Sequence, residues 1–262
     1  MAFGPTVQQV HSFASQAFIR KSFKNPFQVA SVLSFFFNVD YHDPSHVQSM
    51  QSGSTFQEMM PFWYAGGTEY DVLCQKFKDV IRTANQGRLL QQDDDDWHTT
   101  VDGKMAQIVL CDQLARNAFR GTEEAFAGDE GAMEIAREMS QELISSTTSS
   151  SRPDNSGIIL PSLQGIVYPP YLQFIISPLM HSELPNDHDL AVEVADFSVE
   201  VAPDHMKQSF QSTKDMELDH KTVIDQFGRY PHRNKKLGRE STAEELEWLS
   251  SDDIPDWAKS QA

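Results

Sequence analysis

One predicted helix carries the residues best suited to binding an anion. In the stretch 105–120 (MAQIVLCDQLARNAFR), Asp112, Arg116 and Arg120 recur at every fourth position, with Asn117 on the neighbouring stripe. Apolar residues cover nearly all of the remaining circumference, a pattern typical of a buried helix. A buried arginine is unfavourable unless it is paired, and one aspartate does not neutralise two arginines. We therefore expect either a further protein carboxylate or an anionic ligand beside this helix.

A second motif, Pro178–Glu183 (PLMHSE), offers proton-transfer chemistry. An imidazole titrates near neutral pH, so His181 can serve as a general acid or base, with Glu183 orienting it or carrying a second proton. In the alternative interpretation both side chains cap a helix or pair with the arginines. For an isolated His-x-Glu pair this structural interpretation is the commoner one.

The third motif concentrates basic side chains in a predicted turn of an otherwise acidic protein. The polar residues of segment 227–239 include Arg229, His232, Arg233, Asn234 and Arg239. Guanidinium groups are suited to carboxylate or phosphate, so Arg229, Arg233 and Asn234 are candidate ligands for an anion. His232 is a second candidate for a catalytic residue that transfers a proton. The alternative is that the arginines tie loops and helix C-termini together.

Other catalytic patterns are absent from the sequence. It contains no Gly-rich phosphate loop, no His-Glu-x-x-His or Cys-x-x-Cys spacing, and no Gly-x-Ser-x-Gly elbow. The side chains of His181, Glu183, His220 and His232 could gather a metal ion, but nothing in their spacing demands one. We therefore predict no metal site, and the sequence identifies no cofactor.

The composition limits the classes of partner. The 262 residues carry a formal net charge of −17, which disfavours nucleic acid and anionic membrane surfaces as partners and otherwise favours solubility. No uninterrupted apolar stretch approaches the roughly 18 residues that a membrane span needs. Two cysteines are too few for a disulfide framework, so a reducing compartment is expected.

The hydrophobic periodicity predicts an all-α protein with a single domain over residues 28–249 and no convincing β-strand. Predicted helices cover 7–18, 32–39, 69–85, 104–119, 129–144, 188–210 (split near Pro203) and 213–227, and the capping box at 241–245 begins a last one.

Several segments are expected to be irregular. We predict loops at 45–55 and 145–157, the second a mobile insertion, and a solvated turn at Asp93–Asp96. The apolar stretch Ile158–Met180 is interrupted by prolines and a glycine, so we expect short buried pieces joined by turns. Residues 250–262 form a polar tail that is expected to fray.

The first 27 residues allow two interpretations. Residues 1–39 contain no acidic side chain but carry Arg20, Lys21 and Lys24, a composition similar to that of an organelle transit peptide. Alternatively, residues 7–18 are an ordinary amphipathic first helix. The first interpretation predicts a mitochondrial or plastid protein whose leader is residues 1–27, and the second predicts a cytoplasmic protein.

Three groups of residues, in this order, resemble the family DUF924. They are DQLARNAFRGT (112–122) with AFA (125–127) and Asp129, then PLMHSE (178–183), then FGRYPHRN (227–234) with LGREST (237–242) and Glu244-Glu245. Residues 32–37 and 62–77 are similar to the N-terminal part of the family. The resemblance covers about residues 28–249. Leu114-Ala115 departs from the usual Phe-Pro of the family, and residues 145–157 and 1–27 look like additions.

The resemblance implies a fold but no activity. The family is all-helical and similar to tetratricopeptide-repeat proteins, and its activity is unassigned. We expect the motifs to form one pocket for a small anionic molecule, with Arg116, His181 and Arg233 lining a shared cavity. The alternatives are a tetratricopeptide-like module that binds a protein partner, and a buried polar network that only fixes the packing of the helices. We favour the pocket, because the polar residues lie in apolar runs.

Overall fold

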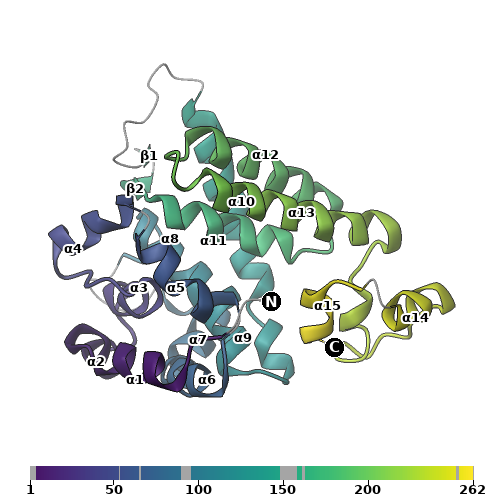
Figure 1. The fold of residues 1–262 in the computed structure, drawn as a ribbon, viewed down its shortest axis with the longest axis horizontal. Helices are drawn as coiled ribbons and strands as arrows, with labels where there is room; N and C mark the ends of the chain where they lie inside the picture. Colours follow the sequence, from purple (N-terminus) through teal and green to yellow (C-terminus); the bar gives the residue numbers. More distant parts are fainter. Residues whose placement is uncertain are drawn as a thin grey trace.

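The described part of the chain folds mainly into helices, as the computed structural model shows for residues 4–52, 54–64, 66–89, 96–147, 158–160, 163–251 and 254–261. Figure 1 shows long helices stacked along one side of the molecule, a group of shorter helices from the N-terminal half packed against them, and the last two helices at one end. The predicted all-α class is confirmed.

Short helices build the N-terminal part. They are α1 (Val7–Ser15), α2 (Ala17–Lys24), α3 (Val29–Phe37), α4 (Pro44–Gln48), η1 (Ser49–Ser52), α5 (Ser54–Tyr64), α6 (Thr68–Cys74), η2 (Gln75–Phe77) and α7 (Lys78–Asn85). A reciprocal capping box between Thr6 and Gln9 begins α1. Inside this group, Phe35 stacks on Tyr70 and contacts Phe13, with ring centroids 5.7 and 5.4 Å apart. Helices α1 and α2 thus belong to the aromatic core.

The loop predicted over 45–55 is wrong, because α4, η1 and the start of α5 occupy its described residues. The missed signal is local: Asp43 caps the backbone N–H of Ser45, and Pro44 stands in the first turn of α4. Likewise, the single helix predicted over 69–85 is interrupted by η2. Of the turn predicted at Asp93–Asp96, residues 93–95 lie outside the described part of the chain.

The central helical segment changes its geometry along its length. Helix α8 (Val101–Ile108) leads into the π-helical turn η4 (Val109–Leu114), which continues into α9 (Ala115–Ala118). The turn η5 (Glu123–Phe126) and helix α10 (Asp129–Thr147) follow. Gly128 lies so close to η4 that a β-carbon there would be 2.7 Å from Cβ of Cys111. This close approach brings the start of α10 against the π-helical turn.

After the residues 148–157, which lie outside the described part, two short strands pair antiparallel. Strand β1 (Ile158–Leu160) pairs with β2 (Gly165–Val167), with Ile159 opposite Ile166. Helix α11 (Pro169–Met180) then runs without interruption and is buried at every position. The short pieces predicted over Ile158–Met180 are therefore wrong for α11. Two of its prolines stand in the first turn, where a missing N–H is harmless.

Two long helices complete the main layer. Helices α12 (Pro185–Val201) and α13 (Lys207–Phe227) pack side by side (Figure 1). The predicted interruption near Pro203 is confirmed. Helix α13 ends at Gly228, whose φ of 67° lies in the left-handed region that terminates helices.

The C-terminal segment folds back onto the end of this layer. It contains η7 (Pro231–Arg233), α14 (Ala243–Ser250), begun by the predicted Thr242–Glu245 capping box, and α15 (Asp256–Gln261). The predicted fraying is wrong for α15, because Ala258 is buried and the Trp257 ring stacks on His220 with centroids 3.8 Å apart. None of the described helices combines the length and the hydropathy that crossing a bilayer requires.

Candidate functional site

Asp112 lies at the centre of a buried polar cluster on η4. Its carboxylate is fully buried and accepts hydrogen bonds from Arg116 Nη2 at 2.9 Å and from Ser177 Oγ at 3.0 Å. Nδ1 of His181 lies 2.6 Å from the same carboxylate oxygen that Arg116 contacts. Because Ser177 and His181 are one turn apart at the end of α11, Asp112 joins the π-helical turn to that helix.

The surrounding charges fix the protonation states of Asp112 and His181. Burial by itself would raise the pKa of Asp112, but the charges and hydrogen bonds of His181 and Arg116 lower it well below its ordinary value. Burial lowers the pKa of His181; Asp112 opposes this, and Arg116 and Arg233 add to it. At neutral pH the pair is therefore a carboxylate and a neutral imidazole whose Nδ1–H donates to Asp112.

The other ring nitrogen of His181 keeps its lone pair. Among the described residues, no group forms a hydrogen bond with Nε2 of His181, and its side chain is 21% exposed. A carboxylate that holds Nδ1 orients the imidazole and fixes its tautomer. The pair has the geometry of a general base that can take a proton from a bound molecule and return it.

Arg116 is held between two carboxylates. Its Nη2 also donates to Asp129 Oδ1 at 3.1 Å, and its guanidinium carbon lies 5.2 Å from the centre of the Phe126 ring. The Nε of Arg116 is buried and has no partner within the described chain. The sequence argument required a further carboxylate or an anionic ligand, and Asp129 supplies the carboxylate.

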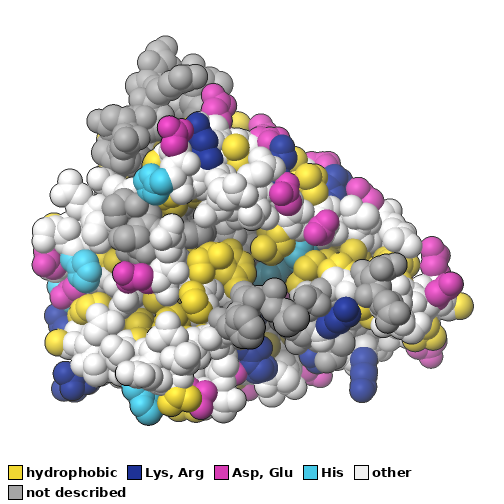
Figure 2. All heavy atoms as spheres, viewed as in Figure 1, with side chains coloured by type: hydrophobic (Ala, Val, Ile, Leu, Met, Phe, Trp, Pro, Cys, Tyr) yellow, Lys and Arg dark blue, Asp and Glu magenta, His cyan; other side chains and the backbone are white. Residues whose placement is uncertain are grey.

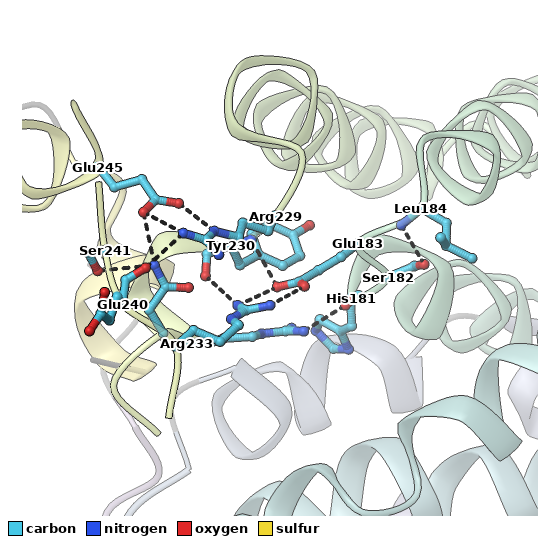
Figure 3. A network of polar contacts seen from close by, with 12 residues as sticks. His181, Ser182, Glu183, Leu184, Arg229, Tyr230, Arg233, Glu240, Ser241 and Glu245 are labelled. Atoms are coloured by element: carbon cyan, nitrogen blue, oxygen red, sulfur yellow. Dashed lines mark hydrogen bonds and ion pairs between the residues drawn. The ribbon is translucent and has the colours of Figure 1, made fainter. Parts of the chain in front are cut away.

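Arg233 reaches the same cluster from η7. Its guanidinium carbon lies 4.6 Å from the centre of the Tyr230 ring and 5.7 Å from that of Phe126. Its Nη1 donates to the backbone oxygen of His181 at 2.8 Å (Figure 3). Over the described residues, Arg233 forms no ion pair with a carboxylate. Burial lowers the pKa of Arg233, and the neighbouring charge of Arg116 lowers it further.

The structure thus brings Arg116, His181 and Arg233 together: Asp112 contacts Arg116 and His181, and both arginines lie over the Phe126 ring. Figure 2 shows a hollow on the molecular face between the long helices and the C-terminal helices. A histidine side chain is recessed in this hollow, and hydrophobic side chains lie on either side of it. The four clustered polar residues come from η4, α9, the end of α11 and η7.

Arg120 and Asn117 point elsewhere. Arg120 forms two hydrogen bonds with Asp71 on α6, at 2.8 and 3.1 Å, and its side chain is 49% exposed. Asn117 accepts a bond from Arg120 at 2.6 Å and donates to the backbone of its own helix. Asp71 already neutralises Arg120, so this pair has no unmatched positive charge for an anion.

Glu183 does not orient His181, contrary to the role considered from the sequence. Its carboxylate accepts two hydrogen bonds from Arg239, at 2.6 and 2.9 Å, and one from the backbone N–H of Tyr230 at 2.9 Å. These bonds lower the pKa of Glu183 against the effect of burial. Glu183 is therefore an anchor between the α11–α12 turn and the segment before η7 (Figure 3).

Arg229 and Asn234 are likewise committed to a protein carboxylate. Arg229 forms two hydrogen bonds with Glu245 on α14, at 2.6 and 2.9 Å (Figure 3). Asn234 Nδ2 donates to the same carboxylate at 3.1 Å. They fix the capping box of α14 to the preceding turn. These contacts fit the alternative interpretation of the third motif, in which its side chains tie loops and helix ends together.

His232 lies beside the cluster, in an aromatic environment. Its ring is 5.4 Å from the rings of Tyr230 and Trp257, it is buried, and its Nδ1 has no partner in the described chain. Burial lowers the pKa of His232 to about 3, with Arg233 contributing. His220, which stacks on Trp257, also has a pKa lowered to about 3 by burial. His232 is therefore neutral at physiological pH and is not positioned by a carboxylate.

Sequence reasoning missed several members of the cluster. Ser177 stands four residues before His181 on the same helix face, a spacing that could have identified it. Phe126 and Asp129 belong to the first group of residues that resembles the family, but no local pattern places them against Arg116. Within the described residues, no group of three or more His, Cys, Asp or Glu side chains is arranged to hold a metal ion.

Comparisons with known proteins give a family and a fold. Residues 32–253 match the family described as "Bacterial protein of unknown function (DUF924)". A solved structure, that of the protein of unknown function ATU0120 from Agrobacterium tumefaciens, has 22% sequence identity and a TM-score of 0.52, and the match covers 79% of this chain and 99% of that chain. No curated protein matches the sequence.

Proposed function

The chain belongs to the family DUF924, which has no assigned function, and from the geometry of its site we propose that it binds a small anionic molecule bearing a carboxylate or phosphate group. In this proposal Arg233 is the principal cation, Arg116 supports it, and His181 transfers a proton as the base oriented by Asp112. Arg120, Asn117, Glu183, Arg229, Asn234 and His232 have structural roles.

The observation that carries the proposal is the state of Arg233. A mostly buried guanidinium is unfavourable unless charged partners compensate for the lost hydration. Every other arginine of the three motifs has a carboxylate, whereas within the described chain Arg233 has a backbone carbonyl and two aromatic rings. Guanidinium groups bind carboxylate and phosphate in a bidentate manner, so an incoming anion would supply the missing partner.

His181 gives the site a chemical function besides binding. Its backbone oxygen holds Arg233 and its Nδ1 holds Asp112, so the imidazole and the cation are fixed to the same short segment. An anion on Arg233 would therefore lie near the available Nε2. A proton taken from such a molecule would be stabilised by the ionised Asp112. This arrangement supports an enzyme that acts on an anionic substrate by acid–base chemistry.

A second candidate is a tetratricopeptide-like interaction module in which the cluster only fixes helix packing. The observation in its favour is that protein carboxylates already satisfy Arg116, Arg120, Arg229 and Arg239. Under this alternative, the aromatic contacts of Arg233 and its bond to His181 hold η7 against α11 and no ligand is needed.

Thermal unfolding in the presence of anions separates the two candidates. The parent protein is compared with Arg233→Met and with Lys235→Met, which removes the same charge from an exposed position on the same segment. The probes are phosphate, sulfate, acetate and malonate, each against chloride at equal ionic strength. A ligand at 100 times its Kd should stabilise the parent by about 2.7 kcal/mol.

We expect one class of anion to raise the Tm of the parent and of Lys235→Met but not that of Arg233→Met. Removing an unpaired buried cation should leave the free energy of unfolding within about 1 kcal/mol or increase it. A parent protein that no probe stabilises, combined with a large loss of stability in Arg233→Met, would overturn the anion site in favour of the structural role. Stabilisation by phosphate and sulfate only, or by the carboxylates only, identifies the ligand class.

A further inference from the structure

The turn that carries His181 is held at several backbone and side-chain positions. Ser182 Oγ accepts a hydrogen bond from the backbone N–H of Leu184 at 3.0 Å (Figure 3). The same hydroxyl donates to Asp187 Oδ2 at 2.6 Å. Asp187 is in turn bound by Arg137 of α10 through two hydrogen bonds of 2.8 and 2.7 Å. The backbone carbonyl oxygen of Ser182 also has a hydrogen-bond partner.

That partner is a buried His–Glu pair. Nε2 of His188, on α12, lies 2.9 Å from the backbone oxygen of Ser182, and Nδ1 lies 2.7 Å from Oε1 of Glu217 on α13. The side chains of His188 and Glu217 are both 0% exposed. The pair is therefore a closed bridge from α13 through α12 to the residue that follows His181.

The number of protons in this bridge follows from the acceptors. A backbone carbonyl oxygen only accepts, so Nε2 of His188 must carry a proton. The 2.7 Å contact between Nδ1 and Oε1 requires a second proton, since two lone pairs would otherwise face each other in a dry interior. Two arrangements satisfy this count: an imidazolium beside a carboxylate, or a neutral imidazole that accepts from a protonated Glu217.

The second oxygen of Glu217 distinguishes the two arrangements. Oε2 is buried and has no hydrogen-bond partner in the described chain. An unpaired oxygen of an ionised carboxylate costs far more free energy in the interior than the carbonyl oxygen of a carboxylic acid. The orphan oxygen therefore favours the neutral arrangement.

We infer that Glu217 is a protonated carboxylic acid that donates to a neutral His188, and that this pair positions His181 by holding the carbonyl oxygen of Ser182. His188 and Glu217 are positioning residues in this inference, since neither touches the proposed anion site. The inference concerns the protonation and placement of residues, so it holds or fails without any ligand. Its functional meaning rests on the proposed role of His181.

The charged and titratable groups around the pair are compatible with a proton that stays in place at neutral pH. They are Asp187 on α12, Lys221 and His220 on α13, and Tyr230 before η7. Burial raises the pKa of Glu217, although the hydrogen bond from His188 opposes it. The hydrogen bond to Glu217 raises the pKa of His188 against the effect of burial. Both directions agree with two protons on the pair, and the unpaired oxygen of Glu217 selects between the two arrangements.

Nitrogen-15 NMR of the histidine rings of the full-length protein reads the arrangement directly. We expect His188 to show one protonated and one unprotonated ring nitrogen at neutral pH, with the proton on Nε2. Infrared difference spectra between the parent and Glu217→Gln should contain the carbonyl band of a protonated carboxyl group. Two protonated ring nitrogens in His188, or the absence of that band, would overturn the inference.

Variants at position 217 test the positioning role. Glu217→Ala removes the donor to His188 and should shift the ring signals and the titration of His181, whereas Glu217→Gln keeps an N–H donor and should restore both. Glu193→Gln, at an exposed position of α12, is the matched control and should change neither. A titration of His181 that is the same in Glu217→Ala as in the parent contradicts the positioning role. If Glu217→Ala does not fold, Glu217→Gln alone tests the inference. His181 signals in Glu217→Gln that differ from those of the parent would contradict the neutral arrangement.

Discussion

The Nδ1 of His181 lies 2.6 Å from Oδ1 of Asp112, although 69 positions separate the two residues in the chain. The aspartate is fully buried on a π-helical turn, and the histidine ends a helix that is buried at every position. In the proposed function, this carboxylate and imidazole form the unit that carries the acid–base chemistry, and Arg233 beside them is the cation that binds the anion.

Replacing Asp112 by Asn should lower the pKa of His181 further. The carboxylate of Asp112 raises that pKa against burial and the charges of Arg116 and Arg233, so its neutralisation leaves only the lowering influences. We expect a decrease of roughly 1 to 3 units, measured by NMR titration of the His181 ring. Ser177→Ala removes one hydrogen bond of Asp112 without changing its charge and should have a smaller effect. An unchanged or higher pKa in Asp112→Asn would refute the pairing.

Arg116→Met should destabilise the protein by an amount on the order of 3 to 5 kcal/mol, because it leaves Asp112 and Asp129 without their shared cation. Chemical denaturation gives the free energy of unfolding. Adding Asp129→Asn should recover part of the loss, since one of the two unpaired charges is then removed. Arg120→Met is the matched control: its half-exposed pair with Asp71 should contribute about 1 kcal/mol or less. Equal losses in Arg116→Met and Arg120→Met would contradict this account.

The protein should lose stability as the pH falls below about 6.5, the ordinary histidine value. His220 and His232 have pKa values lowered from 6.5 to about 3, so below pH 6.5 the unfolded chain binds protons that the folded protein does not. The stability from each histidine is fully present above pH 6.5 and is lost progressively down to about pH 3. By pH 5 each should have lost about 2 kcal/mol.

Urea unfolding between pH 7 and pH 5 measures this dependence in the parent, His220→Phe, His232→Phe and the double variant. Each single substitution should reduce the slope, and the double variant should have the smallest one. A slope that the double variant leaves unchanged would place the pH dependence elsewhere.

Removal of residues 1–27 should unfold or strongly destabilise the protein. Helices α1 and α2 contribute Val10, Phe13 and Ile19 to the buried core, and Phe13 contacts Phe62 with centroids 5.3 Å apart. Phe13→Ala alone should reduce the free energy of unfolding by about 3 to 5 kcal/mol, whereas Val7→Ala, at a half-exposed position, should change it little. A deletion variant with a nearly unchanged thermal midpoint would instead support a transit peptide and an organellar protein.

The helices were predictable because their signals are local. The apolar periodicity, the Thr242–Glu245 capping box and the glycine that ends α13 act within one or two turns, so the sequence by itself determines them. The burial of Asp112 and Arg116 was predictable for the same reason, since the helix that carries them is apolar on its other faces. Two polar segments were wrongly predicted to lack helices. At 45–55 the composition outweighed the local cap that begins α4. In the C-terminal tail it outweighed Trp257, whose ring packs on α13.

The assignment of partners was decided only by the tertiary structure. Arg116, Arg120, Arg229 and Arg233 are chemically equivalent in the sequence, and each could have faced a ligand. Asp129, Asp71 and Glu245 come from other segments and neutralise three of them, whereas packing places Arg233 over two aromatic rings without an ion pair to a described carboxylate. A charge is neutralised by whatever lies within a few ångströms, and those distances depend on how the helices pack together.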